Sequence, residues 1–184
     1  MKHPFLTGER LYLRALERAD AQSILPWIND RRVISNLTIF RPMNLAAEEA
    51  FIDAVNRSET DIVFGMCDRA TDSLVGVAGL QRLDQKNRHA MFGIFIGDAR
   101  NRGRGFGSEA TSMVVNYAFD TLNLSRVWLH VFQNNKAGIR VYEKVGFKQE
   151  GLLREDDFRS GRYQNTVVMG VLRRERRRRR AARS

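Results

Sequence analysis

Gly103-Arg104-Gly105-Phe106-Gly107-Ser108-Glu109-Ala110 joins an apolar segment with the composition of a strand, Met91–Gly97, to a segment with the pattern of a helix, Ser108–Phe119. Three of its first five residues are glycines at alternate positions. Glycine lets successive backbone N–H groups turn toward one point, and a following helix adds unpaired N–H groups and the positive end of its dipole. The stretch therefore predicts a strand, a polyanion-binding loop and a helix, in that order.

Two other loop chemistries do not fit these residues. A dinucleotide fingerprint requires G-x-G-x-x-G and a nucleoside triphosphate loop ends in G-K-[ST], whereas this loop reads G-x-G-x-G and holds no lysine. A flexible glycine turn without a ligand is the remaining alternative, and the position between a strand and a well-formed helix speaks against it. Arg102 and Arg104 could add charge-assisted contacts to a phosphate, or could lie in solvent as surface arginines.

The chain around the loop predicts a mixed, mostly antiparallel sheet with one parallel pair. Three apolar runs separated by hairpin-length turns precede the loop, and a strand, a helix and a closing hairpin follow it. We expect strands over Ile62–Cys67, Leu74–Leu83, His89–Gly97 and Arg126–Val131, a helix over Lys136–Val145 that stops at Gly146, and a hairpin of Gln149–Leu153 with Thr166–Leu172 around Ser160-Gly161. A strand, helix, strand order implies a right-handed crossover between parallel strands.

The N-terminal third predicts a strand and helices without evident chemistry. We expect a strand over Leu11–Ala15, a helix capped by Asp20, a short helical piece from Asn29-Asp30 through Leu37, a loop over Thr38–Met43 and a helix capped by Asn44.

Length and composition restrict the class of protein. The 184 residues suit one domain with a real core, and a hydrophobic fraction of 43% is typical of globular proteins. No apolar run approaches the roughly 18 residues that cross a bilayer, and charges interrupt the amino terminus where a signal peptide would be apolar. We therefore expect a cytoplasmic protein without a membrane span. Cys67 is the only cysteine, which excludes an internal disulfide.

The positive charge is concentrated at the carboxyl end. The formal net charge is +10, of which the segment Arg173–Ser184 contributes +7 through eight arginines and one glutamate. Such a tail can bind phosphates of RNA, of a ribosome or of a membrane surface, or it can be a solvated, disordered terminus. We expect the disordered tail, over residues 174–184, and leave its partner open.

A second motif lies downstream, from Asn135 to Phe147. Asn135, Gly138 and Tyr142 fall on one side of the expected helix, because separations of three, four and seven residues are close to whole turns. Gly138 leaves room for a ligand to approach the backbone. Tyr142 presents either a functional hydroxyl from this face or the half-buried ring of a core aromatic.

Together these residues resemble the GNAT superfamily of N-acetyltransferases. Residues 102–107 match its Q/R-x-x-G-x-G/A signature, and residues 135–147 look like its N-x-x-[AGS]…Y-E-K-x-G-F helix. Leu11-Tyr12-Leu13-Arg14, Glu150-Gly151-Leu152-Leu153-Arg154 and Gly161-Arg162-Tyr163 resemble the branch that acetylates ribosomal proteins and polyamines. The resemblance covers roughly residues 8–173 and implies an α+β fold of three α/β/α layers, the acyl-CoA N-acyltransferase fold. Its splayed, mostly antiparallel sheet would have about seven strands within a single domain of residues 1–173.

The resemblance also implies a cosubstrate and roles for individual residues. Acetyl-CoA would bind along the splayed strand, the glycine loop and the downstream helix, and an amine acceptor would enter from the opposite side. The residues expected to bind the cosubstrate are Phe95, Ile96, Gly97, Arg102, Gly103, Arg104, Gly105, Phe106, Gly107, Ser108, Asn135, Ala137, Gly138 and Arg140. Tyr142 would donate a proton to the departing thiolate, which suits a phenol with a pKa near 10.

Several points stay open. His89, His130, Glu150 and Glu155 are candidates for the general base, and a water chain is the alternative. No ligand spacing indicates a metal site. The acceptor could be a polyamine, an amino sugar or a protein N-terminus, and the oligomeric state is open, with a homodimer as one assembly found among relatives. A second hypothesis is a ribosome- or RNA-associated binding protein that keeps an acetyltransferase scaffold and uses the arginine tail.

Overall fold

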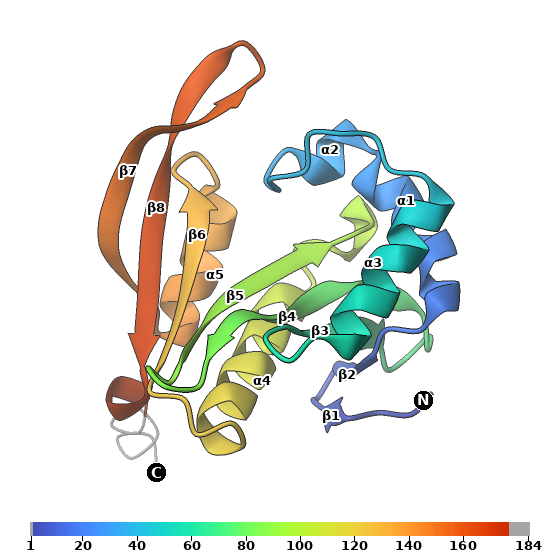
Figure 1. Ribbon diagram of the computed structural model, residues 1–184, viewed down its shortest axis with the longest axis horizontal. Helices are drawn as coiled ribbons and strands as arrows, with labels where there is room; N and C mark the ends of the chain where they lie inside the picture. Colours follow the sequence, from blue (N-terminus) through green and yellow to red (C-terminus); the bar gives the residue numbers. More distant parts are fainter. Residues whose placement is uncertain (1, 177–184) are drawn as a thin grey trace.

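A single sheet of eight strands organises the protein, with helices on both of its faces (Figure 1). The computed structural model describes residues 2–176. The strands are β1 (Leu6–Thr7), β2 (Leu11–Ala15), β3 (Ile62–Asp68), β4 (Leu74–Asp84), β5 (His89–Ile96), β6 (Arg126–Phe132), β7 (Lys148–Arg159) and β8 (Arg162–Leu172). The helices are α1 (Ala21–Ile28), α2 (Arg31–Ile34), α3 (Leu45–Arg57), α4 (Phe106–Asp120) and α5 (Lys136–Val145), with 3-10 turns η1 (Arg18–Asp20) and η2 (Ala99–Asn101).

The strand order is β1-β2-β3-β4-β5-β6-β8-β7, and β5 with β6 is the only parallel pair among the described strands. This pairing is short: it joins His89 to Arg126, Ala90 to Val127 and Met91 to Trp128, and then ends. Beyond that point the two strands diverge, as Figure 1 shows above the label of β5. The divergence is the splay that the resemblance implies, and it leaves an open edge on each strand.

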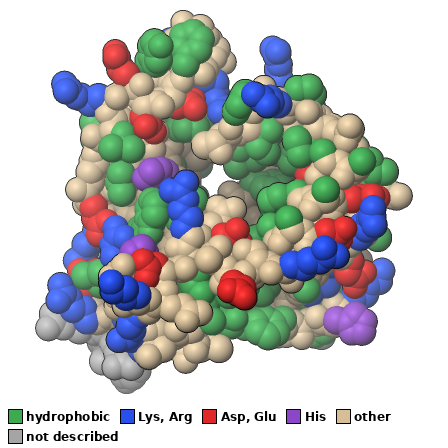
Figure 2. All heavy atoms as spheres, in the orientation of Figure 1, with side chains coloured by type: hydrophobic (Ala, Val, Ile, Leu, Met, Phe, Trp, Pro, Cys, Tyr) green, Lys and Arg blue, Asp and Glu red, His purple; other side chains and the backbone are tan. Residues whose placement is uncertain are grey.

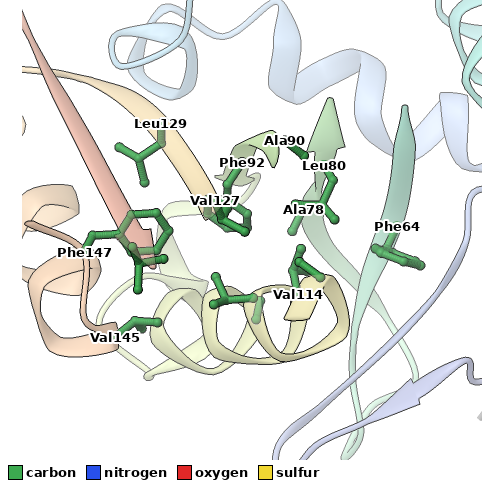
Figure 3. Close-up of a cluster of buried hydrophobic side chains, with 14 of the residues drawn as sticks. Phe64, Ala78, Leu80, Ala90, Phe92, Val114, Val127, Leu129, Val145 and Phe147 are labelled. Carbon is green, nitrogen blue, oxygen red and sulfur yellow. The ribbon is translucent and has the colours of Figure 1, made fainter. Parts of the chain in front are cut away.

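Alternation along the strands separates two cores. One face of the sheet packs against α4 and α5, with Phe64, Ala78, Phe92, Val114 and Phe147 among its fully or nearly buried side chains (Figure 3). On the other face, Val63 and Val77 pack with Ile24 and Ile52 from α1 and α3. Because successive strand side chains point to opposite faces, neighbours such as Val63 and Phe64 serve different cores. The predicted three-layer, mostly antiparallel fold is confirmed.

Most predicted elements are present, with differences at their ends. Helix α4 begins at Phe106 rather than Ser108, and the sheet has eight strands because the short β1 adds to the expected seven. Strands β7 and β8 run almost to the Ser160-Gly161 turn, because bulges in β7 let the pairing continue. Gly146 ends α5 in the left-handed conformation, as predicted, with φ of 118°.

Two predictions at the ends of the domain need correction. Asp20 is the residue before α1, but its side chain makes no capping hydrogen bond to that helix. Its carboxylate instead accepts two hydrogen bonds from the Arg14 guanidinium, at 2.7 and 2.8 Å. The folded chain also continues past residue 173. Residues 173–176 form a helical turn in which Arg176 donates to Asn116, Val145 and Ser112. The predicted disorder of the remaining tail, residues 177–184, lies outside the described residues.

Candidate active site

The glycine loop ends in an uncapped helix N-terminus. Gly103 and Gly105 have φ of 76° and 86°, a backbone conformation that side chains disfavour, and Gly105 is the N-cap of α4 without a capping side chain. The first intrahelical hydrogen bond runs from the Glu109 amide to the Gly105 carbonyl. The amides of the first helical residues, Phe106, Gly107 and Ser108, therefore have no partner within the helix and can converge on an anion.

The back of the loop is braced by Arg10 and Leu11, at the start of β2. Arg10 donates from Nη1 to the carbonyl oxygen of Arg104 at 3.1 Å. In return, the Glu109 carboxylate in the first turn of α4 accepts the backbone amides of Arg10 at 2.8 Å and Leu11 at 3.2 Å. These contacts join segments about a hundred residues apart, so the spacing of the motifs gave no sign of them. They hold the loop in a fixed shape.

The two arginines of the loop have different surroundings. Arg104 bonds to the buried carboxylate of Asp68 at 3.1 Å and to Asn101 at 2.9 Å, and its guanidinium lies over the Phe106 ring. Its side chain therefore serves the loop itself. Arg102 is exposed, and its backbone amide donates to the Ala99 carbonyl at 3.0 Å. Its side chain makes no hydrogen bond or ion pair with the described residues, although it lies near enough to Asp30 and Asp98 to lower the pKa of both carboxyls. Arg102 is the loop arginine that can reach a phosphate.

The open edge of β5 continues from this loop. The Gly97 amide donates to the Val75 carbonyl of β4 at 3.0 Å. Backbone groups in an antiparallel pair alternate in direction, so those of Phe95 also face β4, whereas those of Ile96 and Ile94 face the splay. Of the three residues expected to pair with a pantetheine, Ile96 has backbone groups directed correctly. Ile94 joins it, a residue that sequence patterns did not single out.

Tyr142 lies where the splay begins. Its ring packs edge-on against Phe92 of β5 at 6.2 Å and against Phe147 at 5.9 Å between ring centroids. Phe92 is the residue after Met91, the last β5 residue paired with β6. Burial raises the pKa of Tyr142 to about 12. Its hydroxyl has no hydrogen-bond partner within residues 2–176, so a protonated phenol is available there.

The amino end of α5 lies on the same side of the sheet as the glycine loop. Asn135 caps the helix, because its side-chain oxygen accepts the Gly138 amide at 2.9 Å. Its NH2 group makes no hydrogen bond with any described residue and can still donate to a ligand. Ala137 and Arg140 are exposed on the first turns of the same helix. The structure thus brings the second motif and the glycine loop to the same side of the splay, through the contact of α5 with α4.

The opposite face of the splay is lined by aromatic side chains. The Trp27 indole lies directly over Gly97, where any side chain would collide with it, and packs against Phe95 with ring centroids 6.4 Å apart. On β6, Trp128 and His130 point to this same face and contact each other with ring centroids 5.2 Å apart. Figure 2 shows a hollow near the centre of the view, with hydrophobic side chains on its right and histidine and basic side chains on its left. We refer to this surface as the acceptor face.

The four candidate general bases lie at different places in the structure. His130 is exposed on the acceptor face, beyond the last β5–β6 pair. His89 lies at the far end of β5, with Nε2 3.8 Å from Asp84. Glu150 is bound to Arg126, and Glu155 lies in the β7 bulge, where its amide donates to Asn165. Residues 2–176 contain no group of three acidic, histidine or cysteine side chains that could hold a metal ion.

Comparisons with known proteins agree with this geometry. Residues 10–148 match the family described as acetyltransferase (GNAT) domain. The chain is 31% identical to a spermidine N(1)-acetyltransferase of Vibrio cholerae, over 90% of this chain and 94% of that protein. It is 27% identical to a putative ribosomal N-acetyltransferase, YdaF, of Bacillus subtilis, over 91% and 94%. The crystal structure of the Vibrio cholerae spermidine N-acetyltransferase with CoA and spermine superposes with a TM-score of 0.85 at 30% identity, covering 92% of this chain and 99% of that one.

The described helices offer no membrane span. None of those in residues 2–176 is both long and apolar enough to cross a bilayer.

Proposed function

We propose that this chain, which belongs to the GNAT acetyltransferase family and is an acetyl-CoA-dependent N-acetyltransferase, holds the cosubstrate diphosphate on the first turn of α4 and acetylates a primary amine at the splay. Three sets of unpartnered groups on neighbouring elements support this proposal. They are the amides of Phe106, Gly107 and Ser108 at the start of α4, the open backbone edge of β5 at Ile96, and the Tyr142 hydroxyl beside Phe92 of β5. A diphosphate, a pantetheine amide chain and a thioester need these groups in this order.

The residues present fit acetyl-CoA. Gly103 and Gly105 adopt the left-handed backbone conformation, and the Arg102 side chain has no partner among the described residues. The N-terminus of α4 has no capping side chain that would compete with a ligand for its amides. When bound, acetyl-CoA supplies an acetyl group activated as a thioester. The chain's own task is to fix that group beside the acceptor and to manage two protons.

Tyr142 supplies the first proton transfer. Its phenol stays protonated across the physiological range, because burial in a wall of aromatic rings disfavours the phenolate. A neutral phenol donates a hydrogen bond from its oxygen, and it can give the proton to the thiolate that leaves when the amine attacks. Its place beside Phe92, at the first unpaired step of β5, puts that oxygen at the narrow end of the splay.

His130 manages the second proton. A lysine-like amine must lose a proton before it attacks, which costs about 4.6 kcal/mol at pH 7 for a pKa near 10.4. Of the four candidate bases, His130 is the one that lies on the acceptor face beyond the last strand pair and is exposed there. It can accept the proton directly or through a water.

The acceptor is a primary amine, and the relatives provide the first compounds to test. Spermidine and spermine are named for the Vibrio cholerae proteins, and a ribosomal substrate is named for the Bacillus subtilis one. The alternative of an RNA-associated protein depends on the arginine tail. Since residues 177–184 lie outside the described residues, that alternative stays a prediction, as does a homodimer.

The test combines binding and turnover. Calorimetry should show association of the folded protein with acetyl-CoA and with CoA. Release of the CoA thiol should then be followed with polyamines, amino sugars, aralkyl monoamines and N-terminal peptides, and at least one class should give turnover well above acetyl-CoA hydrolysis. Binding of CoA without acetyl transfer to any of these amines would contradict the proposal.

A further inference from the structure

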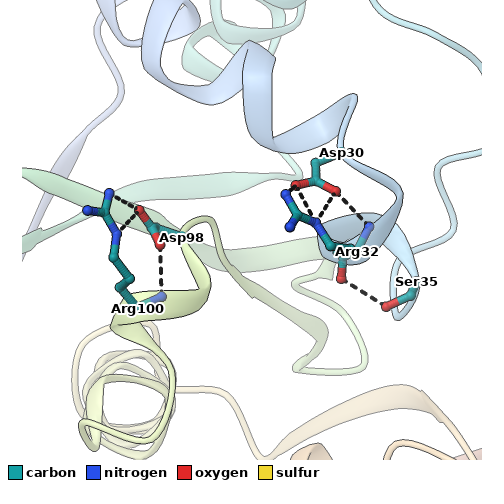
Figure 4. A network of polar contacts seen from close by, with 5 residues as sticks. All are labelled: Asp30, Arg32, Ser35, Asp98 and Arg100. Atoms are coloured by element: carbon teal, nitrogen blue, oxygen red, sulfur yellow. Dashed lines mark hydrogen bonds and ion pairs between the residues drawn. The ribbon is translucent and has the colours of Figure 1, made fainter.

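Arginines of the chain itself neutralise the carboxylates that border the acceptor face. Four such pairs lie on this side of the sheet: Asp30 with Arg32, Asp98 with Arg100, Asp157 with Arg159, and Glu150 with Arg126, the last at the end of β6 that pairs with His89. They come from four different places in the fold: the start of α2, the segment after β5, the tip of the β7–β8 hairpin, and strands β6 and β7, which lie on either side of β8. Figure 4 shows the first two pairs, one at the start of α2 and the other in the segment that follows β5.

The two pairs in Figure 4 are closed by several hydrogen bonds. Arg32 donates from Nη2 to Asp30 at 2.7 Å and from its backbone amide at 2.8 Å. Arg100 likewise donates to Asp98, from Nη2 at 2.6 Å and from its backbone amide at 2.8 Å. In both cases the neighbouring arginine is the main reason that the pKa of the carboxyl is lowered. Neither carboxylate therefore presents a free negative charge to a ligand.

The pair of Asp157 and Arg159 also connects the β7–β8 hairpin to α2. Arg159 lies 3.2 Å from the Asp157 carboxylate, which also accepts Gln164 at 3.1 Å. Its Nη1 donates to the carbonyl oxygen of Ile34 on α2 at 2.5 Å. The hairpin tip is thus tied to α2 by a hydrogen bond between residues that lie 125 positions apart.

Arginine guanidinium groups also lie over two of the aromatic rings on this face. The Arg126 guanidinium lies over the Trp128 ring at 5.9 Å, and that of Arg159 lies over the Phe132 ring at 5.0 Å. The faces of such rings are where an ammonium group would otherwise bind. Trp27 and Phe95 remain, packed edge to face on the opposite wall. They offer apolar contact area to an acceptor.

Three other acidic residues in this region stand outside the four pairs. Glu155 and Asp156 lie in the β7 bulge opposite Asn165, whose side chain bonds to Gln133. Thr166 of β8 pairs with Phe132 of β6, and both side chains are on the acceptor face. Because successive side chains of a strand point to opposite faces, the Asn165 side chain is on the face that packs against α5. Glu48 is 4% exposed on α3, and burial raises the pKa of its carboxyl.

A polycation therefore finds little to bind. A polyamine carries several ammonium groups at neutral pH, because each amine has a pKa near 10. Only one of them reacts, so the others need carboxylates or ring faces as partners. Each would have to displace a guanidinium already in place, which exchanges one cation for another without net gain. The formal net charge of +10 also repels a polycation during approach.

We propose that the preferred acceptor is a small primary monoamine with an apolar body, held by Trp27 and Phe95, and that the four arginine–carboxylate pairs select against polyamines. This inference rests on the proposed function, and it narrows the acceptor to one chemical class. It predicts that this chain differs in acceptor from the spermidine acetyltransferases it resembles, although it shares their fold.

The test compares two acceptors and two double variants at saturating acetyl-CoA. For the wild type, kcat/KM for 2-phenylethylamine should exceed that for spermidine by about tenfold or more. The double variant Arg32→Gln with Arg100→Gln frees two carboxylates without changing the apolar wall. We expect its kcat/KM for spermidine to rise about tenfold, with that for 2-phenylethylamine nearly unchanged.

The control is Arg31→Gln with Arg154→Gln, which removes the same charge from two exposed arginines that have no ion pair in residues 2–176. A rise with spermidine in this control equal to that of the test variant would overturn the role of the pairs. Spermidine matching or exceeding the monoamine in the wild type would overturn the acceptor class.

Binding decides the inference even without turnover. Calorimetry with the CoA complex should detect 2-phenylethylamine more readily than spermine in the wild type, and spermine should gain affinity in the test variant. Tight binding of spermine to the wild type would sink the inference alone, whereas failure of every amine to be acetylated would sink the proposed function.

Discussion

Tyr142 of α5 packs edge-on against Phe92 of β5, and Phe92 is the first residue beyond the last paired step between β5 and β6. The contact places a phenol oxygen where the sheet opens. It joins the second sequence motif to the strand that precedes the first.

Replacing the phenol should affect chemistry more than binding. In Tyr142→Phe, kcat should fall by about 100-fold, because a positioned general acid contributes at least that much. The ring contacts with Phe92 and Phe147 remain, so the Kd for acetyl-CoA from calorimetry should change less than threefold. An unaltered kcat in steady-state assays would remove Tyr142 from the mechanism.

The same residue makes stability depend on pH in the alkaline range. Burial raises the pKa of Tyr142 from 10.0 to about 12, so above pH 10 the unfolded chain releases a proton that the folded chain retains. Stability contributed by this group is therefore complete below pH 10 and lost as the pH rises toward 12. Urea unfolding at pH 8 and pH 11 should show a smaller loss for Tyr142→Phe than for the wild type. Equal losses would contradict the raised pKa.

His130→Gln should lower kcat/KM by about tenfold at pH 7, since the acceptor amine then lacks a local base. The deficit should shrink at pH 9, where more of the amine is already neutral. Pre-steady-state acetyl transfer measured at both pH values checks this. A constant deficit would assign His130 to positioning rather than proton transfer.

A branched residue in the glycine loop should abolish cosubstrate binding. Gly105 has φ of 86°, and a Cβ there would lie 2.5 Å from Nη1 of Arg10, the group that braces the loop. We expect Gly105→Val to raise the Kd for acetyl-CoA by more than about tenfold. Gly161→Val is the matched control, because Gly161 has φ of 78° in the hairpin turn with open space around it. Similar losses of affinity in both variants would show that backbone strain alone is responsible.

The buried pair of Arg14 and Asp20 should matter for stability rather than activity. Both residues are less than 10% exposed, and removing one partner leaves a buried charge. Arg14→Met should therefore cost about 3–5 kcal/mol of unfolding free energy. Arg18→Met, which breaks the exposed pair with Glu49, should cost less than about 1 kcal/mol. Denaturant titration of both variants makes the comparison.

Sequence patterns were sufficient wherever the cause is local. Short apolar segments predict β2 and β5. Asn44 and Asn135 cap the helices that follow them, since the side chain of each accepts a hydrogen bond from the amide three residues further on. Positive φ at Gly105 and Gly146 is likewise a property of glycine at a helix end. The bulges that lengthen β7 left no comparable signal, because their registers depend on β8.

The sequence by itself therefore determined the order of elements, the glycine loop, the capped α5 and the family to which these motifs belong. Only the tertiary structure decided which groups remain free for a ligand. It assigns Arg104 to Asp68, leaves Arg102 unpaired within the described chain, and ties Arg159 to Ile34 across 125 residues. The physical reason is that a motif specifies backbone conformation over a few residues. The charge and shape of an acceptor surface arise from side chains that meet only when distant segments pack together.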